Sequence, residues 1–296
     1  MYELIEVGER TYYIDCPAKM GLYRAGNSEV YLIDSGNDKQ AGKKALRLIE
    51  ANGWRLMGIL NTHAHADHTG GNRFLQDRTG CTVSAPGSEG AVAAHTFLEP
   101  ALLYGGCPPK ELRGKFLLAQ ESLHVRELSN NLPEGLALLS LGGHYLDMAG
   151  IKTPDGVWFL ADALFPKSTI EKYHVFYLYD VGGFLCTLDR LETLEGRLFI
   201  PSHAEVTDDL SALIALNRQK VLEICGVITK LCQTPCTFDE VLKGVFDYYG
   251  LVMDFTQYAL VGSTVRSYLT YLHETGALEV CFEQNRLLWA KKEESA

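Results

Sequence analysis

Short apolar runs that end close to a histidine or an aspartate recur through the first two-thirds of the chain. Four such runs, each with the polar residue that follows it, are 57–60 with His63, 136–141 with His144, 157–161 with Asp162 and 198–201 with His203. Each run has the length and composition of a strand. The pattern therefore predicts several strands whose ends present polar side chains.

The hydrophobic pattern changes after residue 206, where apolar residues recur at helical spacing. These residues are Leu210, Leu213, Ile214, Val221, Ile224, Ile228 and Leu231. Residues 207–210 predict the start of the helix, with Asp208 and Asp209 as two carboxylates in its first turn, where they favour the helix dipole. Pro235 predicts that the helix ends before it.

Two further helices and a hairpin are expected to follow. Residues 237–240 have the capping-box pattern and open a second helix that Gly250 can end. A third helix is predicted over about 255–274. Two strand-like runs within 278–290 then predict a hairpin with its turn at 284–285.

The densest chemistry lies in the segment 61–71, Asn-Thr-His-Ala-His-Ala-Asp-His-Thr-Gly-Gly. Four potential metal ligands fall within six positions there: His63, His65, Asp67 and His68. On an extended backbone His63 and His65 point the same way and could bind one cation. Helical sites usually place ligands three or four residues apart, so the spacing predicts a strand end that opens into a loop, with Gly70 and Gly71 supplying the turn. Imidazole and carboxylate ligands suit zinc, iron or manganese, and two ligand pairs indicate two metals.

The other histidines divide into two groups. His144 and His203 stand at strand ends like the motif itself, whereas His95, His124, His174 and His273 have no ligand partner at metal spacing. Ordinary surface or core roles are expected for this second group. His174 lies in the aromatic segment 173–179, which could wall the site or form a buried strand.

With these residues in this order, the chain resembles the metallo-β-lactamase-fold hydrolase superfamily, in its glyoxalase II-like or lactonase-like H-x-H-x-D-H branch. The resemblance covers roughly residues 5–205, including the early Asp34, and implies an α/β fold that is an αβ/βα sandwich. It also implies two divalent metal ions, zinc first, with iron or manganese as alternatives. The implied ligands are His63, His65 and His144 for one metal, Asp67, His68 and His203 for the other, and Asp162 as the bridge.

The resemblance further implies how the reaction proceeds. A metal lowers the pKa of bound water from about 15.7 toward 7 and can polarise the substrate oxygen, so the nucleophile is a metal-bound hydroxide. Asp67 would be a ligand and a proton acceptor that serves the leaving group, and Asp34 would support the ligands from outside. Two divalent cations, two carboxylates and a hydroxide leave a charge of about +1, so the formal net charge of −10 does not decide the substrate.

Departures from known subgroups narrow the activity. Residues 162–165, Asp-Ala-Leu-Phe, match glyoxalase II, but its following Gly-Cys-Gly-Arg segment is absent. Phe165 stands where acyl-homoserine lactonases have a tyrosine. We therefore expect a dinuclear metal-dependent hydrolase of a small ester, thioester or lactone. The alternatives are a phosphodiesterase or ribonuclease of the same superfamily and a non-catalytic metal-containing binding module.

The chain is expected to divide into a catalytic domain over 1–205 and a winged-helix-like domain over 206–296, since three helices and a hairpin resemble a winged helix. Nucleic-acid binding would require a basic face, but residues 206–296 contain eight Lys or Arg against twelve Asp or Glu. We instead expect this domain to pack, to form a homodimer or to shape the mouth of the active site. The partner would then be a small-molecule substrate.

Composition agrees with a cytoplasmic enzyme. The chain has 296 residues, of which 47% are hydrophobic, so it can bury a large core. Its N-terminal residues lack the basic and apolar regions of a secretory signal, and no apolar run approaches the length of a membrane span. Eight cysteines without paired C-x-x-C spacing are expected to be reduced thiols. Cys232 and Cys236 could bind a third metal, but a helix end explains their spacing better.

Overall fold

The structure is a computed structural model that describes residues 2–292. Met1 and residues 293–296 lie outside the described residues, and with them Glu293 and Glu294 of the charge count. The strands are β1 (Glu3–Glu6), β2 (Thr11–Asp15), β3 (Met20–Arg24), β4 (Glu29–Ile33), β5 (Arg55–Leu60), β6 (Thr82–Ala85), β7 (Arg126–Glu127), β8 (Ala137–Ser140), β9 (Ala149–Lys152), β10 (Val157–Ala161), β11 (Leu198–Pro201), β12 (Leu278–Glu283) and β13 (Arg286–Lys291).

Helices alternate with these strands and dominate the C-terminal third. They are α1 (Lys39–Ala51), α2 (Ala66–Thr69), α3 (Asn72–Thr79), α4 (Glu89–Ala94), α5 (Leu98–Tyr104), the 3₁₀ helix η1 (Lys110–Leu112), α6 (Lys167–Tyr173), α7 (Val181–Glu192), α8 (Ser211–Leu231), α9 (Phe238–Tyr249) and α10 (Phe255–Glu274). Within residues 2–292 no helix is both long enough and apolar enough to cross a membrane.

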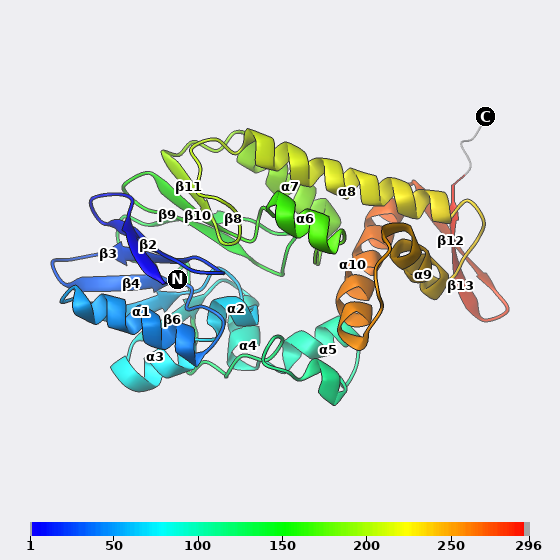
Figure 1. Ribbon diagram of the computed structural model, residues 1–296. Helices are drawn as coiled ribbons and strands as arrows, with labels where there is room; N and C mark the ends of the chain where they lie inside the picture. Colours follow the sequence, from blue (N-terminus) through cyan, green and yellow to red (C-terminus); the bar gives the residue numbers. More distant parts are fainter. Residues whose placement is uncertain (1, 293–296) are drawn as a thin grey trace.

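Two sheets form the N-terminal two-thirds of the molecule (Figure 1). The first has the order β1-β2-β3-β4-β5-β6-β7 and is antiparallel from β1 to β4 and parallel from β4 to β7. The second has the order β11-β10-β9-β8, and only its β10–β11 pair is parallel. In a parallel pair the carboxyl ends of both strands lie at the same edge, so β10 and β11 can deliver their following residues to one place.

The alternation of side chains along β10 explains how the second sheet is buried on both faces. Val157 and Phe159 pack into the core between the sheets, together with Tyr23 and Leu60 of the first sheet. Trp158 and Leu160 point the other way, into the core that the C-terminal helices share. The opposite face of the first sheet is covered by α1 and α3. The result is the αβ/βα sandwich that the sequence predicted.

The C-terminal elements also match their predicted positions. The three helices occur at 211–231, 238–249 and 255–274, and a hairpin follows with Gln284 and Asn285 at positive φ in its turn. The capping box between Thr237 and Glu240 is formed, and Gly250 ends α9 in the left-handed conformation with φ 64°. The likeness of this arrangement to a winged helix stays a prediction.

The predicted start of α8 is wrong in one respect. Leu210 occupies the N-cap position, and neither Asp208 nor Asp209 lies in the first turn. Instead the Oδ1 atom of Asp209 accepts a hydrogen bond from the backbone N–H of Ser211, 2.9 Å away, from outside the helix. The side chain of Leu210 is buried, and the acidic pair precedes the helix.

The hydrophobic core does not stop at residue 206. One cluster of buried side chains combines Trp158 and Leu160 of the second sheet with Phe184 of α7, Ile224 of α8 and Leu269 of α10. Figure 1 shows α8 running from the second sheet to the hairpin, with α10 beside α5. The domain boundary at 205–206 therefore stays a prediction, and the C-terminal helices pack directly on the sandwich.

Candidate metal centre

The motif histidines lie at the carboxyl end of β5, at the edge where the two sheets meet. β5 ends at Leu60, and an irregular segment carries His63 and His65 before α2 begins at Ala66. Asp67 and His68 are therefore on a short helical turn, so the prediction of a loop at these two residues is wrong. The turn brings the ring of His68 beside that of His63, with 4.0 Å between the ring centroids.

The two positions after α2 require glycine for a reason other than the predicted turn. Gly70 and Gly71 have φ of −60° and −87°, values that any residue can adopt. A Cβ atom on Gly70 would lie 2.3 Å from the backbone carbon of Asn37, and one on Gly71 would lie 2.3 Å from the carbonyl oxygen of Ser35. Close approach of the β4–α1 loop, and not turn geometry, explains why glycine stands here.

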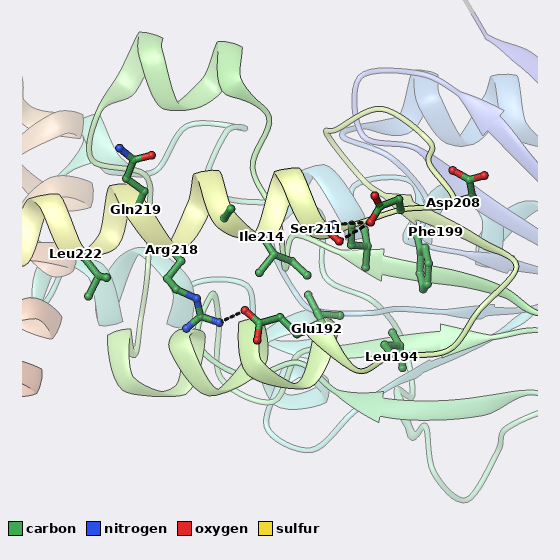
Figure 2. Close-up of a pocket in the computed structure, with 13 residues that line it drawn as sticks. Glu192, Leu194, Phe199, Asp208, Ser211, Ile214, Arg218, Gln219 and Leu222 are labelled. Carbon is green, nitrogen blue, oxygen red and sulfur yellow. Dashed lines mark hydrogen bonds and ion pairs between the residues drawn. The ribbon is translucent and has the colours of Figure 1, made fainter.

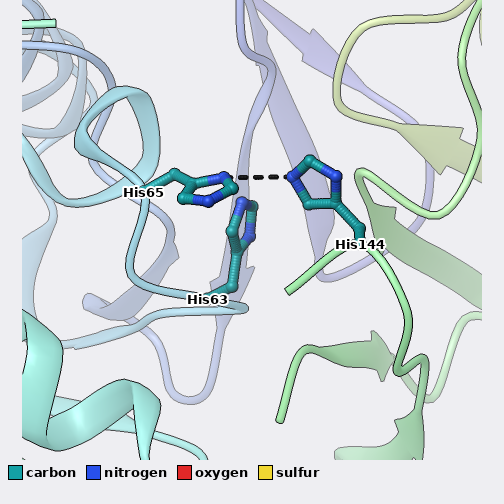
Figure 3. Close-up of side chains that lie close together, drawn as sticks. All are labelled: His63, His65 and His144. Carbon is teal, nitrogen blue, oxygen red and sulfur yellow. Dashed lines mark hydrogen bonds between the residues drawn. The ribbon is translucent and has the colours of Figure 1, made fainter. Parts of the chain in front are cut away.

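Three imidazoles form the first group of candidate ligands, His63, His65 and His144 (Figure 3). Their ligand atoms all lie within 4.8 Å of one another. The Nδ1 atom of His65 and the Nε2 atom of His144 face each other at 3.0 Å. His63 and His144 are buried, and His65 is nearly so, which leaves this group little access to solvent.

The second group contains two carboxylates and two imidazoles: Asp67, His68, Asp162 and His203. The Nε2 atom of His203 lies 3.3 Å from Oδ2 of Asp67 and 3.3 Å from Oδ2 of Asp162. The Nε2 atom of His68 lies 3.3 Å from Oδ1 of Asp162. Asp162 also reaches the first group, because its Oδ2 atom lies 3.6 Å from Nε2 of His144. All seven residues predicted from the sequence are thus brought together.

The donor atoms of this cluster fit divalent cations. The Nε2 atoms of His63 and His68 and Oδ1 of Asp162 are buried and have no hydrogen-bond partner among residues 2–292. Buried polar atoms are normally paired, so unpaired atoms that point toward one another indicate a missing shared partner. Imidazole nitrogens and carboxylate oxygens are the ligands that zinc and related metals accept.

Most of the ligand histidines are held through the ring nitrogen that faces away from the cluster. Nδ1 of His68 lies 2.8 Å from Oδ2 of Asp34, Nδ1 of His144 lies 3.1 Å from the carbonyl oxygen of Tyr177, and Nδ1 of His203 lies 2.9 Å from that of Pro17. Nδ1 of His63 lies 3.1 Å from the hydroxyl of Thr62. Such outer partners fix the ring orientation and the tautomer of metal-binding histidines.

Asp34 joins the motif to the first sheet. It follows β4 with φ 60°, is buried, and accepts hydrogen bonds from the backbone N–H of Thr62 at 2.9 Å and from its hydroxyl at 2.7 Å. The same carboxylate contacts His68. Asp34 therefore lies where the resemblance placed a supporting residue.

His65 is the exception, and its outer contact was missed by the sequence analysis. Its Nε2 atom lies 4.0 Å from Oε1 of Glu99, a buried carboxyl group on α5. Nearby, Glu89 of α4 accepts hydrogen bonds from the backbone N–H groups of Ala64 and Asp147, at 2.9 and 3.0 Å. Both glutamates lie in residues 88–127, the segment that leads from β6 to β7 and that we interpret as an insertion in the fold. No spacing in the sequence connects them with the motif.

The electrostatic environment differs between the two groups. Burial lowers the pKa of His63 well below its usual value and that of His65 to about 3. In the second group, the carboxylate of Asp162 raises the pKa of His203 to about 10. Burial opposes charge on His68, but Asp162, Asp67 and Asp34 outweigh it and raise its pKa. The first group therefore favours neutral imidazole rings, whereas the second group favours ionised carboxylates beside protonated imidazoles.

The turn that presents His144 depends on the glycine before it. Gly143 has φ 116°, and a Cβ atom there would lie 2.2 Å from the backbone nitrogen of Phe184 in α7. The carbonyl oxygen of Gly143 accepts a hydrogen bond from the backbone N–H of Asp180 at 2.9 Å. Glycine is required at this position because both the backbone conformation and the space exclude a side chain.

A cavity of about 440 Å³ opens onto the cluster at Asp162 and His203. Tyr173, Phe176 and Tyr177 line it, so the aromatic segment does wall the site. His174 does not take part, because its ring stacks on Tyr249 at 5.0 Å between centroids.

A larger cavity of about 720 Å³ lies elsewhere, along α7 and α8 (Figure 2). It is lined by residues such as Glu192, Ile214 and Arg218 and by none of the seven cluster residues.

Cys232 and Cys236 do not belong to either group of candidate ligands. Their sulfur atoms lie 3.8 Å apart at the end of α8, and no third ligand joins them within the part of the chain that the structure describes.

The sequence matches the Metallo-beta-lactamase superfamily over residues 13–203, and the chain belongs to that superfamily. A hydroxyacylglutathione hydrolase of Methylococcus capsulatus is 50% identical over 46 residues, which are 16% of this chain and 18% of that protein. The chain thus matches less than a fifth of that relative's length.

Two solved structures are similar to nearly the whole chain. A beta-lactamase domain protein from Burkholderia ambifaria has a TM-score of 0.72 at 17% identity, covering 98% of this chain and 94% of that one. A metallo-beta-lactamase family protein from Thermus thermophilus has a TM-score of 0.70 at 19% identity, covering 99% and 98%. At these identities the likeness establishes the shared fold.

Proposed function

We propose that this protein is a dinuclear metal-dependent hydrolase of a small ester, thioester or lactone, with a thioester as the first candidate. The observation that carries the proposal is the position of Asp162, whose carboxylate lies within 3.6 Å of a histidine from each group. His63, His65 and His144 would hold one ion, Asp67, His68 and His203 the other, and Asp162 both. Zinc suits these ligands, and iron or manganese would also be accepted.

The chemistry of the bound ions is general to such centres. Divalent cations supply Lewis acidity toward the substrate oxygen and make water nucleophilic at neutral pH. The protein's own residues orient this chemistry. Asp34, Thr62, Tyr177 and Pro17 hold the imidazole rings, so the lone pairs that face the centre stay in place.

Asp67 is placed to handle protons. Its side chain is 39% exposed, unlike that of Asp162, which is 6% exposed. Although burial opposes ionisation, His68 and His203 lower the pKa of Asp67 to about 2, so its carboxylate is ionised at neutral pH. We assign it to accept a proton as the nucleophile attacks and to pass it toward the leaving group.

The thioester is favoured by the curated relatives, since a hydroxyacylglutathione ester is a thioester. The acidic composition of residues 206–296 weighs against an RNA substrate, because phosphate binding requires cationic side chains. Retention of all seven candidate ligands weighs against a binding module without turnover. The C-terminal helices would shape the mouth of the site, and a homodimer through them is a further expectation.

The test is hydrolysis of ester, thioester and lactone substrates by zinc-loaded protein, with metal content measured in parallel. We expect turnover that falls about 10²-fold to 10⁴-fold in Asp67→Asn and is lost, together with bound metal, in His144→Ala. His95→Ala is the matched control, because His95 is exposed and belongs to neither group of candidate ligands. No turnover of any of these classes by protein that holds two metal ions would contradict the proposal.

A further inference from the structure

The cavity beside Asp162 and His203 has a composition that selects among substrates. Besides those two residues, its wall is aromatic, aliphatic or neutral polar, and within residues 2–292 it includes no lysine or arginine. Phe165 and Phe176 stack with ring centroids 4.3 Å apart and form its base together with Val261. All three side chains are buried.

Lysines of α6 and an arginine of α10 do not line the cavity and have partners of their own, one of which is the hydroxyl of the wall residue Tyr173. On α6, Lys172 donates a hydrogen bond to the hydroxyl of Tyr173 at 2.9 Å, and Lys167 pairs with Glu171 at 3.5 Å. On α10, Arg266 lies over the ring of Phe238, 3.7 Å from its centroid. Lys115 precedes Phe116 in the chain but does not line the cavity. A carboxylate that entered would lose water without gaining a counter-charge from the wall.

The wall is assembled from three parts of the chain. Phe116 comes from the insertion, Phe176 from the aromatic segment after α6, and Gln257 and Leu260 from α10. The insertion and α10 are packed together through Leu112 and other buried apolar residues. The cavity is therefore formed by segments that pack against one another, and its volume is within the range of small-molecule sites.

We infer that this cavity binds an uncharged, apolar group of the substrate, of the size of a branched aliphatic chain or a phenyl ring, next to the reacting carbonyl. Within a thioester such a group is either the acyl chain or the organic part of the thiol. The inference rests on the proposed function, and it excludes substrates whose group in this cavity carries a carboxylate, as glutathione does. α10 then acts as a specificity element, although it lies in the C-terminal region.

The test compares an uncharged substrate with a charged one, first on the acyl side of the thioester, where the two substrates also match in shape, and then on the thiol side. On the acyl side, the 4-methylpentanoyl and succinyl thioesters of N-acetylcysteamine differ by an isopropyl group against a carboxylate. On the thiol side, the thiol part of the 4-methylpentanoyl thioester of N-acetylcysteamine is uncharged, whereas that of the glutathione thioester is charged. Either the acyl part or the thiol part of the substrate enters the cavity. In the pair that varies this part, we expect kcat/KM to be about tenfold or more higher for the uncharged substrate than for the charged one.

A charge placed in the wall tests the assignment independently of the ligands. Gln257 lines the cavity on α10, so Gln257→Lys should narrow the preference for the uncharged substrate by about tenfold and Gln257→Glu should widen it. Gln219→Lys is the matched control, since Gln219 lines the other cavity (Figure 2) and should leave the preference unchanged. Metal content should stay at the wild-type value in all three variants.

The outcomes separate the two claims. A wild-type enzyme that hydrolyses none of the thioesters, esters or lactones while holding metal contradicts the proposed function. An enzyme that turns over thioesters but prefers the charged member of both pairs overturns the inference alone. The inference is also overturned if Gln257→Lys and Gln219→Lys change the preference for the uncharged substrate equally. The effect would then come from the overall charge of the protein and not from the wall of the cavity.

Discussion

The two groups of the candidate metal centre differ in charge and in access. His63, His65 and His144 offer three imidazoles in a nearly dry environment, without a carboxylate of their own. The other group has two carboxylates, and both Asp67 and His203 reach solvent, with side-chain exposures of 39% and 27%. The substrate-sized cavity opens onto the second group at Asp162 and His203. The contrast indicates that one group is suited to hold an ion and the other to present an ion to substrate.

Asp162 is the residue that connects the groups, so its substitution should have the largest effect. We expect Asp162→Asn to lower kcat/KM at least about 10³-fold, or about 4 kcal/mol. Metal content should fall below the wild-type value, because both groups lose an anionic ligand. Asp77→Asn is the control, since Asp77 only forms an exposed pair with Arg73. Unchanged metal content in Asp162→Asn would show that the groups are independent.

Metal removal should expose how much the protein relies on the centre for stability. Without cations, the carboxylates of Asp67 and Asp162 lie close together, and buried ligand atoms such as Nε2 of His63 have no partner among residues 2–292. At a free metal concentration of about 100 times Kd, each bound ion contributes about 2.7 kcal/mol, or about 5.4 kcal/mol for two ions. Removal of both ions should therefore lower Tm by about 10–20 °C, and added zinc should restore it. A Tm that does not respond would contradict tight metal binding.

The outer support of the second group can be weakened without touching a ligand. Asp34→Asn keeps the shape and tolerates the positive φ at this position, but removes the negative charge beside Nδ1 of His68. We expect metal affinity to fall about 10-fold to 100-fold, measured by competition with a chelating dye. An unchanged affinity would mean that the contact at 2.8 Å only positions the backbone.

The corresponding change in the first group should have the smallest effect. Glu99 lies 4.0 Å from His65, farther than Asp34 from His68, so Glu99→Gln should weaken metal binding by about tenfold at most. Glu111→Gln is the matched control, because Glu111 is exposed in the same insertion. A larger loss in Glu99→Gln than in Asp34→Asn would reverse the comparison between the groups.

The sequence predicted the ligand set because each member occupies a position that local pattern reveals. Asp162 and His203 follow strands β10 and β11, which are parallel neighbours, so their carboxyl ends meet. Apolar runs of strand length are readable without a structure. The capping box at Thr237 and the hairpin at 284–285 were predicted for the same reason, since their signals are contained in a few adjacent residues.

What the sequence did not reveal comes from packing between distant segments. Glu99 contacts His65, and Gln257 lines the cavity with Phe116, yet no periodicity or spacing connects these positions. The glycines after α2 were assigned to turn formation because their close contacts with Asn37 and Ser35 are formed only in the folded chain. The start of α8 directly after the buried Leu210 was likewise not predicted.

The central claim is that the two groups hold two ions that share Asp162. Its most direct test is the metal content of the zinc-saturated and desalted protein, measured by inductively coupled plasma mass spectrometry against protein concentration. We expect two zinc ions per wild-type chain. The variant His203→Ala should lose the ion of the second group, which contains Asp67, His68 and His203, and keep about one ion. One ion or none in the wild-type chain would contradict the account.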